Sequence, residues 1–141
     1  MNISKNSLKR FEIAAIVVVI ISLLMTGPVL AKLAGTNTID PIVTLSSNGR
    51  QALVTGPISC TQGEKLSLEV MVTQETTGAI TEGRLIMSCT GTNQTWAINT
   101  KTQGAATLVE GPAVAWALAT TRDNGVITDS TQWKRDVTVV K

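Results

Sequence analysis

Strict alternation of apolar and polar residues over Lys65–Gln74 constrains the fold of this chain more than any other feature. In an extended strand the even-numbered residues, apolar up to Val72, share one face. The odd-numbered residues, polar except for Met71, share the other face. This pattern is typical of an antiparallel strand with one buried face and one solvated face.

Six further segments with a strand-like pattern surround this one, and turn residues separate them. The segments are 41–45, 51–61, 80–90, 94–102, 113–121 and 131–140. Asp123-Asn124-Gly125 is a strong hairpin signal between the last two. About seven short strands without a helical pattern predict an all-β, antiparallel immunoglobulin-like sandwich over residues 41–141. The chain has no Tyr, so it cannot form the tyrosine corner of a true immunoglobulin domain.

The N-terminal 31 residues have the pattern of a secretory signal peptide. Three basic residues precede an uncharged apolar run, Ile13–Met25, and a Gly-Pro break leads to small residues that end at Ala31. We expect cleavage after Ala31, with residues 32–40 as a tether. The β-domain would then be secreted or extracytoplasmic.

Two alternatives for this leader stay open. The length of residues 13–31 is close to the ~20 residues that span a bilayer. An uncleaved anchor would therefore hold the domain on the outer side of the membrane. Only residues 13–31 would then contact the membrane. Lys9-Arg10-Phe11-Glu12 loosely resembles a type IV pilin leader, and cleavage before Phe11 would make the protein a surface-filament subunit.

Charge and composition exclude one class of partner. Residues 32–141 carry nine basic and nine acidic side chains, because three of the 12 Lys and Arg and one of the 10 Asp and Glu precede them. A neutral domain without a basic patch is not expected to bind nucleic acid.

The chain has two cysteines, Cys60 and Cys89. In an exported domain such a pair most simply forms one disulfide, and both residues are in phase with the apolar residues of their strands. We therefore predict a buried Cys60–Cys89 bridge between the strands at 51–61 and 80–90.

Several short motifs resemble those of small secreted bacterial domains of unknown function. The motifs are Cys60-Thr-x-Gly63-Glu64, Leu66-x-Leu68-x-Val70-x-Val72-Thr73-Gln74, Cys89-Thr-Gly-Thr92, Gln94-Thr-Trp96, Gly111-Pro112-Ala113, Ala119-Thr-Thr-Arg-Asp-Asn-Gly125 and Trp133-x-Arg135-x-Val137-Thr138. The resemblance covers most of residues 51–140. It implies a disulfide-bonded β-sandwich outside the cytoplasm and implies no activity.

No catalytic or metal-binding pattern is visible in the sequence. The chain has no histidine, which excludes histidine-based nucleophile systems and most zinc sites. Asp123, Asn124 and Asp129 have oxygen ligands of the kind Ca²⁺ binds, but they lack the spacing of an EF-hand, and a hairpin turn explains them better. The scattered carboxylates, such as Glu64 and Glu69, are interpreted as a solvated face. We expect no enzyme activity, no cofactor and no metal.

The three tryptophans suggest where a partner binds. Trp96 and Trp116 are in phase with apolar neighbours and are expected in the core, whereas Trp133 has charged neighbours and is expected to be partly exposed. The possible contact surface is therefore Asp123, Asn124, Asp129 and Trp133. The sequence predicts a structural or interaction module for an unidentified protein or glycan. A carbohydrate-binding module that uses Trp133 is the alternative.

Overall fold

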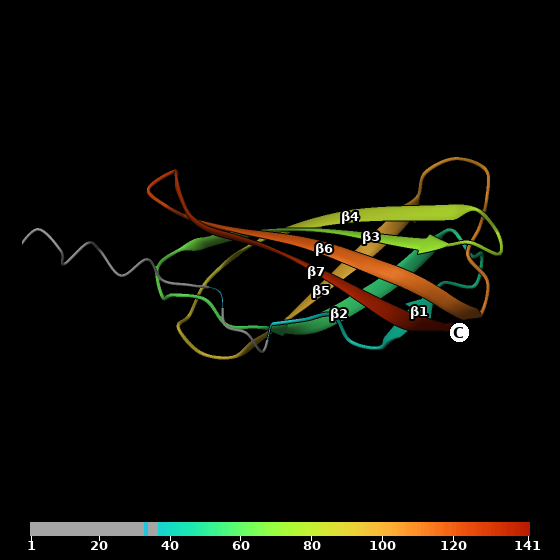
Figure 1. Ribbon diagram of the computed structural model, residues 1–141, viewed down its shortest axis with the longest axis horizontal. Helices are drawn as coiled ribbons and strands as arrows, with labels where there is room; N and C mark the ends of the chain where they lie inside the picture. The colour runs from blue at the N-terminus through green and yellow to red at the C-terminus, as the bar shows by residue number, and fades with distance from the viewer. Residues whose placement is uncertain (1–32, 34–36) are drawn as a thin grey trace, which may run out of the picture. The chain divides into compact units, whose positions relative to one another are not determined.

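Every element of regular secondary structure is a β-strand in the computed structural model, which describes Leu33 and residues 37–141 (Figure 1). The strands are β1 (Ile42–Leu45), β2 (Gln51–Ile58), β3 (Lys65–Gln74), β4 (Ala79–Ser88), β5 (Gln94–Thr102), β6 (Gly111–Asp123) and β7 (Val126–Val140). The all-β class and the expectation of about seven strands are thereby confirmed. Among these residues, no helix is long and apolar enough to cross a membrane. The expected leader, residues 1–31, lies outside the described residues.

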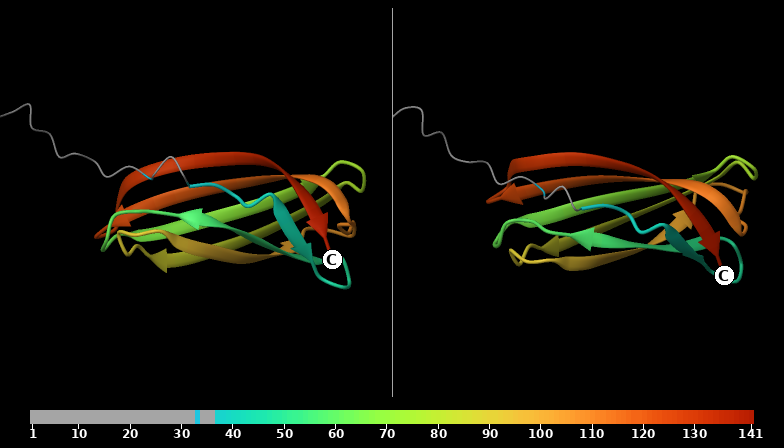
Figure 2. Two further views of the ribbon diagram at one scale, coloured as in Figure 1. Left: turned by 90° about the horizontal axis from the view of Figure 1, so that it is seen from below. Right: turned by 60° about the horizontal axis from the view of Figure 1, so that its bottom comes forward.

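The seven strands form one closed sheet with the order β1-β2-β5-β4-β3-β6-β7. All neighbours are antiparallel except β1 and β7, which pair in parallel from Ile42–Thr138 to Thr44–Val140. The parallel β1–β7 pair makes this a mixed sheet and corrects the expectation of purely antiparallel pairing. Hydrogen-bonded joints at β1–β7 and at β4–β5 close the sheet. Figure 2 shows β6 and β7 on one side of the domain and β2 and β5 on the other.

The joint between β4 and β5 is short. Only Thr81–Thr102 and Glu82–Lys101 are paired there, whereas β4 pairs with β3 along its whole length. Two fully buried hydroxyls hold this joint, since Thr81 Oγ1 and Thr100 Oγ1 are 2.8 Å apart. Thr100 also donates to the Ala52 carbonyl of β2. The closed sheet thus depends on a few polar contacts at this point.

The core lies between the inward faces of the strands. The even-numbered residues of β3 from Leu66 to Val72 are at most 2% exposed, as their alternation predicts. Trp96 of β5 is the largest fully buried side chain. Gly56 of β2 makes room for it, because a Cβ there would lie 2.7 Å from the indole ring. A glycine is therefore required where β2 passes over Trp96.

Residues 37–40, which we expected within a tether, lie against the strands. Ile39 is completely buried, and the Asp40 N–H donates to the Thr55 carbonyl of β2 at 2.8 Å. From the other side, Arg135 of β7 donates to the Ile39 carbonyl at 2.6 Å. This segment therefore covers the sheet between β2 and β7, beyond the short strand β1.

The predicted disulfide is present between Cys60 and Cys89, 29 residues apart in sequence. It joins the segment after β2 to the segment after β4, and both residues are almost completely buried. The bridge lies at the end of the sheet opposite the β4–β5 joint. It therefore links β2 to β4, two strands that are not neighbours in the sheet.

Replacing both cysteines, Cys60→Ala with Cys89→Ala, should lower the free energy of unfolding by about 2–4 kcal/mol, because the unfolded chain regains the entropy of the closed loop. Urea denaturation followed by circular dichroism measures this. Thr90→Ala, beside Cys89 but exposed, is the control and should change little. An unchanged unfolding free energy in the double variant would show that the bridge does not stabilise the domain.

Candidate functional site

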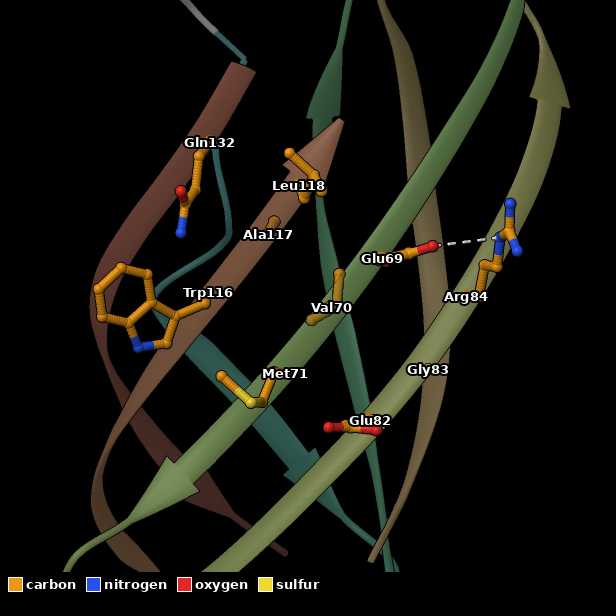
Figure 3. Close-up of a pocket in the computed structure, with 10 residues that line it drawn as sticks. All are labelled: Glu69, Val70, Met71, Glu82, Gly83, Arg84, Trp116, Ala117, Leu118 and Gln132. Carbon is orange, nitrogen blue, oxygen red and sulfur yellow. Dashed lines mark ion pairs between the residues drawn. The ribbon is translucent and has the colours of Figure 1, made fainter. Parts of the chain in front are cut away.

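The outward side of β7, β6, β3 and β4 carries a shallow concavity of about 480 Å³ (Figure 3). Strand register places its side chains in two rows that cross all four strands. The first row is Gln132, Leu118, Glu69 and Arg84, and the second row is Lys134, Trp116, Met71 and Glu82. We call these eight residues the Trp116 face. All of them except Lys134 line the concavity.

The centre of the Trp116 face is apolar. Leu118 is 42% exposed, and Trp116 and Met71, which are adjacent across β6 and β3, are half-buried. Figure 3 shows the indole of Trp116 beside Gln132 and Met71. The centre of this face is therefore apolar and partly open to solvent.

Charged side chains flank this centre and balance each other. Arg84 lies 3.6 Å from Glu69, and the Lys134 amine lies 4.8 Å from the centre of the Trp116 ring. Both members of the Glu69–Arg84 pair are more than half exposed, so solvent screens the pair and it contributes little to stability. With Glu82 included, the face has two carboxylates and two cations. The formal charges of this face therefore sum to zero.

The position of Trp116 corrects the expectation that it belongs to the core. Along β6 the alanines at 113, 115, 117 and 119 are all buried, so the residues between them face outward. Small residues on the inward face of β6 take little volume of a core that also holds large buried side chains such as Trp96. The core position expected for Trp96 is confirmed, since it is 1% exposed.

The four residues of the expected contact surface do not form one patch. Asp123 and Asn124 lie together, exposed, in the β6–β7 turn, and Asn124 has a φ of 47° that suits the hairpin. Asp129 is half-buried and accepts a hydrogen bond from the Leu33 N–H at 2.6 Å. Trp133 is partly buried and packs against the core. A contact role for these residues stays a prediction.

The described part of the chain contains no group of three or more His, Cys, Asp or Glu residues that could hold a metal ion. Asp123 Oδ1 instead accepts a hydrogen bond from the Asn124 side-chain amide at 3.1 Å. The two carboxylate oxygens of Asp129 accept hydrogen bonds from the backbone N–H groups of Leu33 and Ser130. These contacts fit the interpretation of the segment as a hairpin turn.

Comparison with known proteins identifies no family for this chain. The sequence matches no protein-family model and no curated protein. One similar solved structure is a glycosyl hydrolase family 2 member from Bacteroides cellulosilyticus, with 10% identity and a TM-score of 0.47. The match covers 76% of this chain and 14% of that chain, so this domain resembles a small part of a much longer protein. A likeness at this level carries no conclusion about activity.

Sequence reasoning missed the Trp116 face because it treated Val114, Trp116 and Leu118 as the inward side of their strand. One signal could have found it: every intervening residue from Ala113 to Ala119 is alanine, and a strand can bury such a face against bulky neighbours. The cross-strand rows, however, depend on registers that no local pattern gives.

The two tryptophans should differ in their contribution to stability. Trp96→Ala should lower the free energy of unfolding by about 3–5 kcal/mol, because it empties a fully buried site. Trp116→Ala should cost clearly less, because the indole is already partly in contact with water. Urea denaturation of both variants measures the difference. Equal losses would contradict the outward placement of Trp116.

Proposed function

We propose that this protein is an exported interaction module that binds a partner on the Trp116 face and works without catalysis. The single observation that supports it best is the outward position of Trp116 and Leu118 in a concavity with balanced charges. Aromatic residues next to polar groups are enriched in protein contact surfaces. A rigid sheet holds these side chains in fixed positions, which lowers the entropy lost on binding.

The proposed fold is an immunoglobulin-like sandwich whose layers are β4-β3-β6-β7 and β1-β2-β5. The brevity of the β4–β5 joint, which has two residue pairs, supports this interpretation on one side of the domain. On the other side the short strand β1 connects the layers, with two residue pairs to β2 and three to β7. Such sandwiches commonly act as binding modules in exported proteins. The disulfide supports export, because these bonds persist in oxidising compartments. The leader pattern of residues 1–31 and the resemblance to small secreted bacterial domains agree with it.

A non-catalytic role is supported by the chemistry of the side chains. The whole chain lacks histidine, the commonest general base. The Glu69 carboxylate is paired with Arg84, and both are well exposed. Enzymes more often tune an acid or base by burying it, and this face does not do so. The filament alternative depends on cleavage before Phe11, outside the described residues.

A photo-crosslinking amino acid at Leu118 should capture a partner when the full-length protein is expressed in its own cells, because Leu118 lies at the centre of the Trp116 face. The matched control is the same amino acid at Leu53, which is 36% exposed and faces outward on β2. In the Leu118 protein, Trp116→Ala should lower the yield of the adduct about tenfold, the effect of losing an aromatic hot spot.

Mass spectrometry of the adducts gives the result. A specific adduct at Leu118 that depends on Trp116 supports the proposal. Adducts of equal yield at Leu118 and Leu53, or none at Leu118, would show that this face does not bind a partner.

A carbohydrate-binding role is the second candidate, with Trp116 in place of Trp133. The observation in its favour is the outward indole of Trp116 beside the Gln132 amide (Figure 3), with the Glu82 carboxylate on the far side of Met71 in the same concavity. An indole offers a flat apolar surface, and planar amide and carboxylate groups can bind the hydroxyl groups of a sugar ring. Trp133 is a weaker choice, because it packs against the core.

Native gel electrophoresis in soluble hydroxyethylcellulose, a neutral polysaccharide, tests this role. We expect slower migration of the wild-type protein, no effect in Trp116→Ala and a partial effect in Trp116→Phe, because the smaller ring stacks less. Leu53→Ala is the control and should migrate like the wild type. Unchanged migration of the wild type in this polymer, and in neutral xylan and galactomannan, would remove the carbohydrate candidate.

A further inference from the structure

Strand β4 has an open edge beyond its short joint with β5. On one side it pairs with β3 through Ser88, but on the other side its pairing ends at Glu82. Gly83 follows the last paired residue, and β5 still lies close to it, since a Cβ there would lie 2.5 Å from the side chain of Ile98. In the described part of the chain, no strand pairs with residues 84–88 on this side.

The backbone groups of Arg84 and Ile86 point out of the sheet at this edge, and so do those of Ser88, whose carbonyl already accepts a hydrogen bond from the Gln94 side chain at 3.2 Å. Hydrogen-bonding direction alternates along an antiparallel strand, so every second residue faces the same neighbour. The Ile80 carbonyl accepts from Gln103 and the Ser88 carbonyl from the Gln94 side chain, both on the β5 side. The even-numbered residues between them therefore direct their N–H and C=O groups the same way.

The side chains along this edge offer little protection against strand addition. Proteins usually protect open edges with proline, lysine, bulges or inward charges. The charges lie at the two ends of this edge, at Arg84 and at Ser88, whose Oγ accepts from the Lys65 amine at 2.6 Å. Between them, residues 85–87 contain no proline and no charge, and no register shift interrupts their pairing with β3. Ile86 is 64% exposed on the outward side, whereas Leu85 and Met87 are only half-buried on the inward side. An added strand would cover all three apolar side chains.

We propose that a second copy of this protein adds its own β4 to this edge, antiparallel, with Ile86 opposite Ile86 of the second copy. This register places Leu85 opposite Met87 and Arg84 opposite Ser88 on both sides of the two-fold axis, so apolar side chains meet and no like charges lie opposite each other. A register centred on Arg84 would place two like charges opposite each other, which is unfavourable. A closed two-fold dimer is the commonest arrangement of identical chains.

The dimer goes beyond the proposed function and does not depend on it. Pairing β4 with β4 would join two four-stranded runs into one continuous sheet with both Trp116 faces on the same side. The contact is short, since it uses about five residues of each strand. It should therefore be weak and concentration-dependent, like other interfaces below about 1,200 Å².

Cysteine cross-linking tests the register directly. Ile86→Cys should form a disulfide dimer under mild oxidation, because Cα atoms of a hydrogen-bonded antiparallel pair are about 5.5 Å apart, within the range of a disulfide. The matched control is Ile127→Cys, on the β6–β7 hairpin and 56% exposed. Non-reducing mass mapping verifies that Cys60–Cys89 is intact in both variants.

Sedimentation equilibrium of the protein without added cysteines gives an independent measurement. We expect reversible dimerisation that Ile86→Lys weakens at least about tenfold by placing two like charges opposite each other. Ile127→Lys should leave it unchanged, and circular dichroism verifies that both variants fold.

Three outcomes would overturn the proposal. In the first, the protein stays monomeric at every concentration up to the limit of its solubility. In the second, cysteines at residues 86 and 127 cross-link at equal rates, and in the third, Ile86→Lys does not weaken dimerisation. If the protein stays monomeric and this edge instead binds an unrelated extended peptide, the dimer proposal is likewise overturned.

Discussion

The inward alanine face of β6 determines which side chains of this domain reach solvent. Alanines at 113, 115, 117 and 119 take little volume, so the core can accommodate Trp96 and the leucines of β3. Shifting β6 by one residue would instead place Trp116 and Leu118 in this close-packed space and expose the alanines. Overfilling a packed core typically costs about 1–3 kcal/mol or more. The exposed Trp116 face is thus a consequence of how the core is filled.

The two surfaces discussed above lie on one sheet and meet at β4. Glu82 and Arg84 contribute to the Trp116 face, and two residues further Ile86 lies at the open edge. The open edge begins where the pairing of β4 with β5 ends, at Glu82, next to Gly83. If the edges of two copies pair, two copies of the face would act together, which raises the apparent affinity for a repeated ligand.

Sequence patterns predicted the features that depend on local chemistry. The period of β3, the hairpin at Asp123–Gly125 and the Cys60–Cys89 pair follow from alternation, turn residues and cysteine number. The orientation of β6 could not be predicted in this way, because both faces of this strand are apolar. One face carries alanines and the other carries Val, Trp and Leu, so no polar face indicates which side is exposed to solvent. The parallel β1–β7 joint and the burial of Ile39 depend on contacts between segments distant in sequence, which short segments do not encode.

The most direct test of this account is the orientation of β6, because the Trp116 face exists only if that strand is placed as described. Hydroxyl-radical footprinting of the folded protein, read by mass spectrometry, compares oxidation of the three tryptophans in one sample. The account predicts rapid oxidation of Trp116, an intermediate rate for Trp133 and strong protection of Trp96. Protection of Trp116 equal to that of Trp96 would place Trp116 in the core and contradict the proposed binding face.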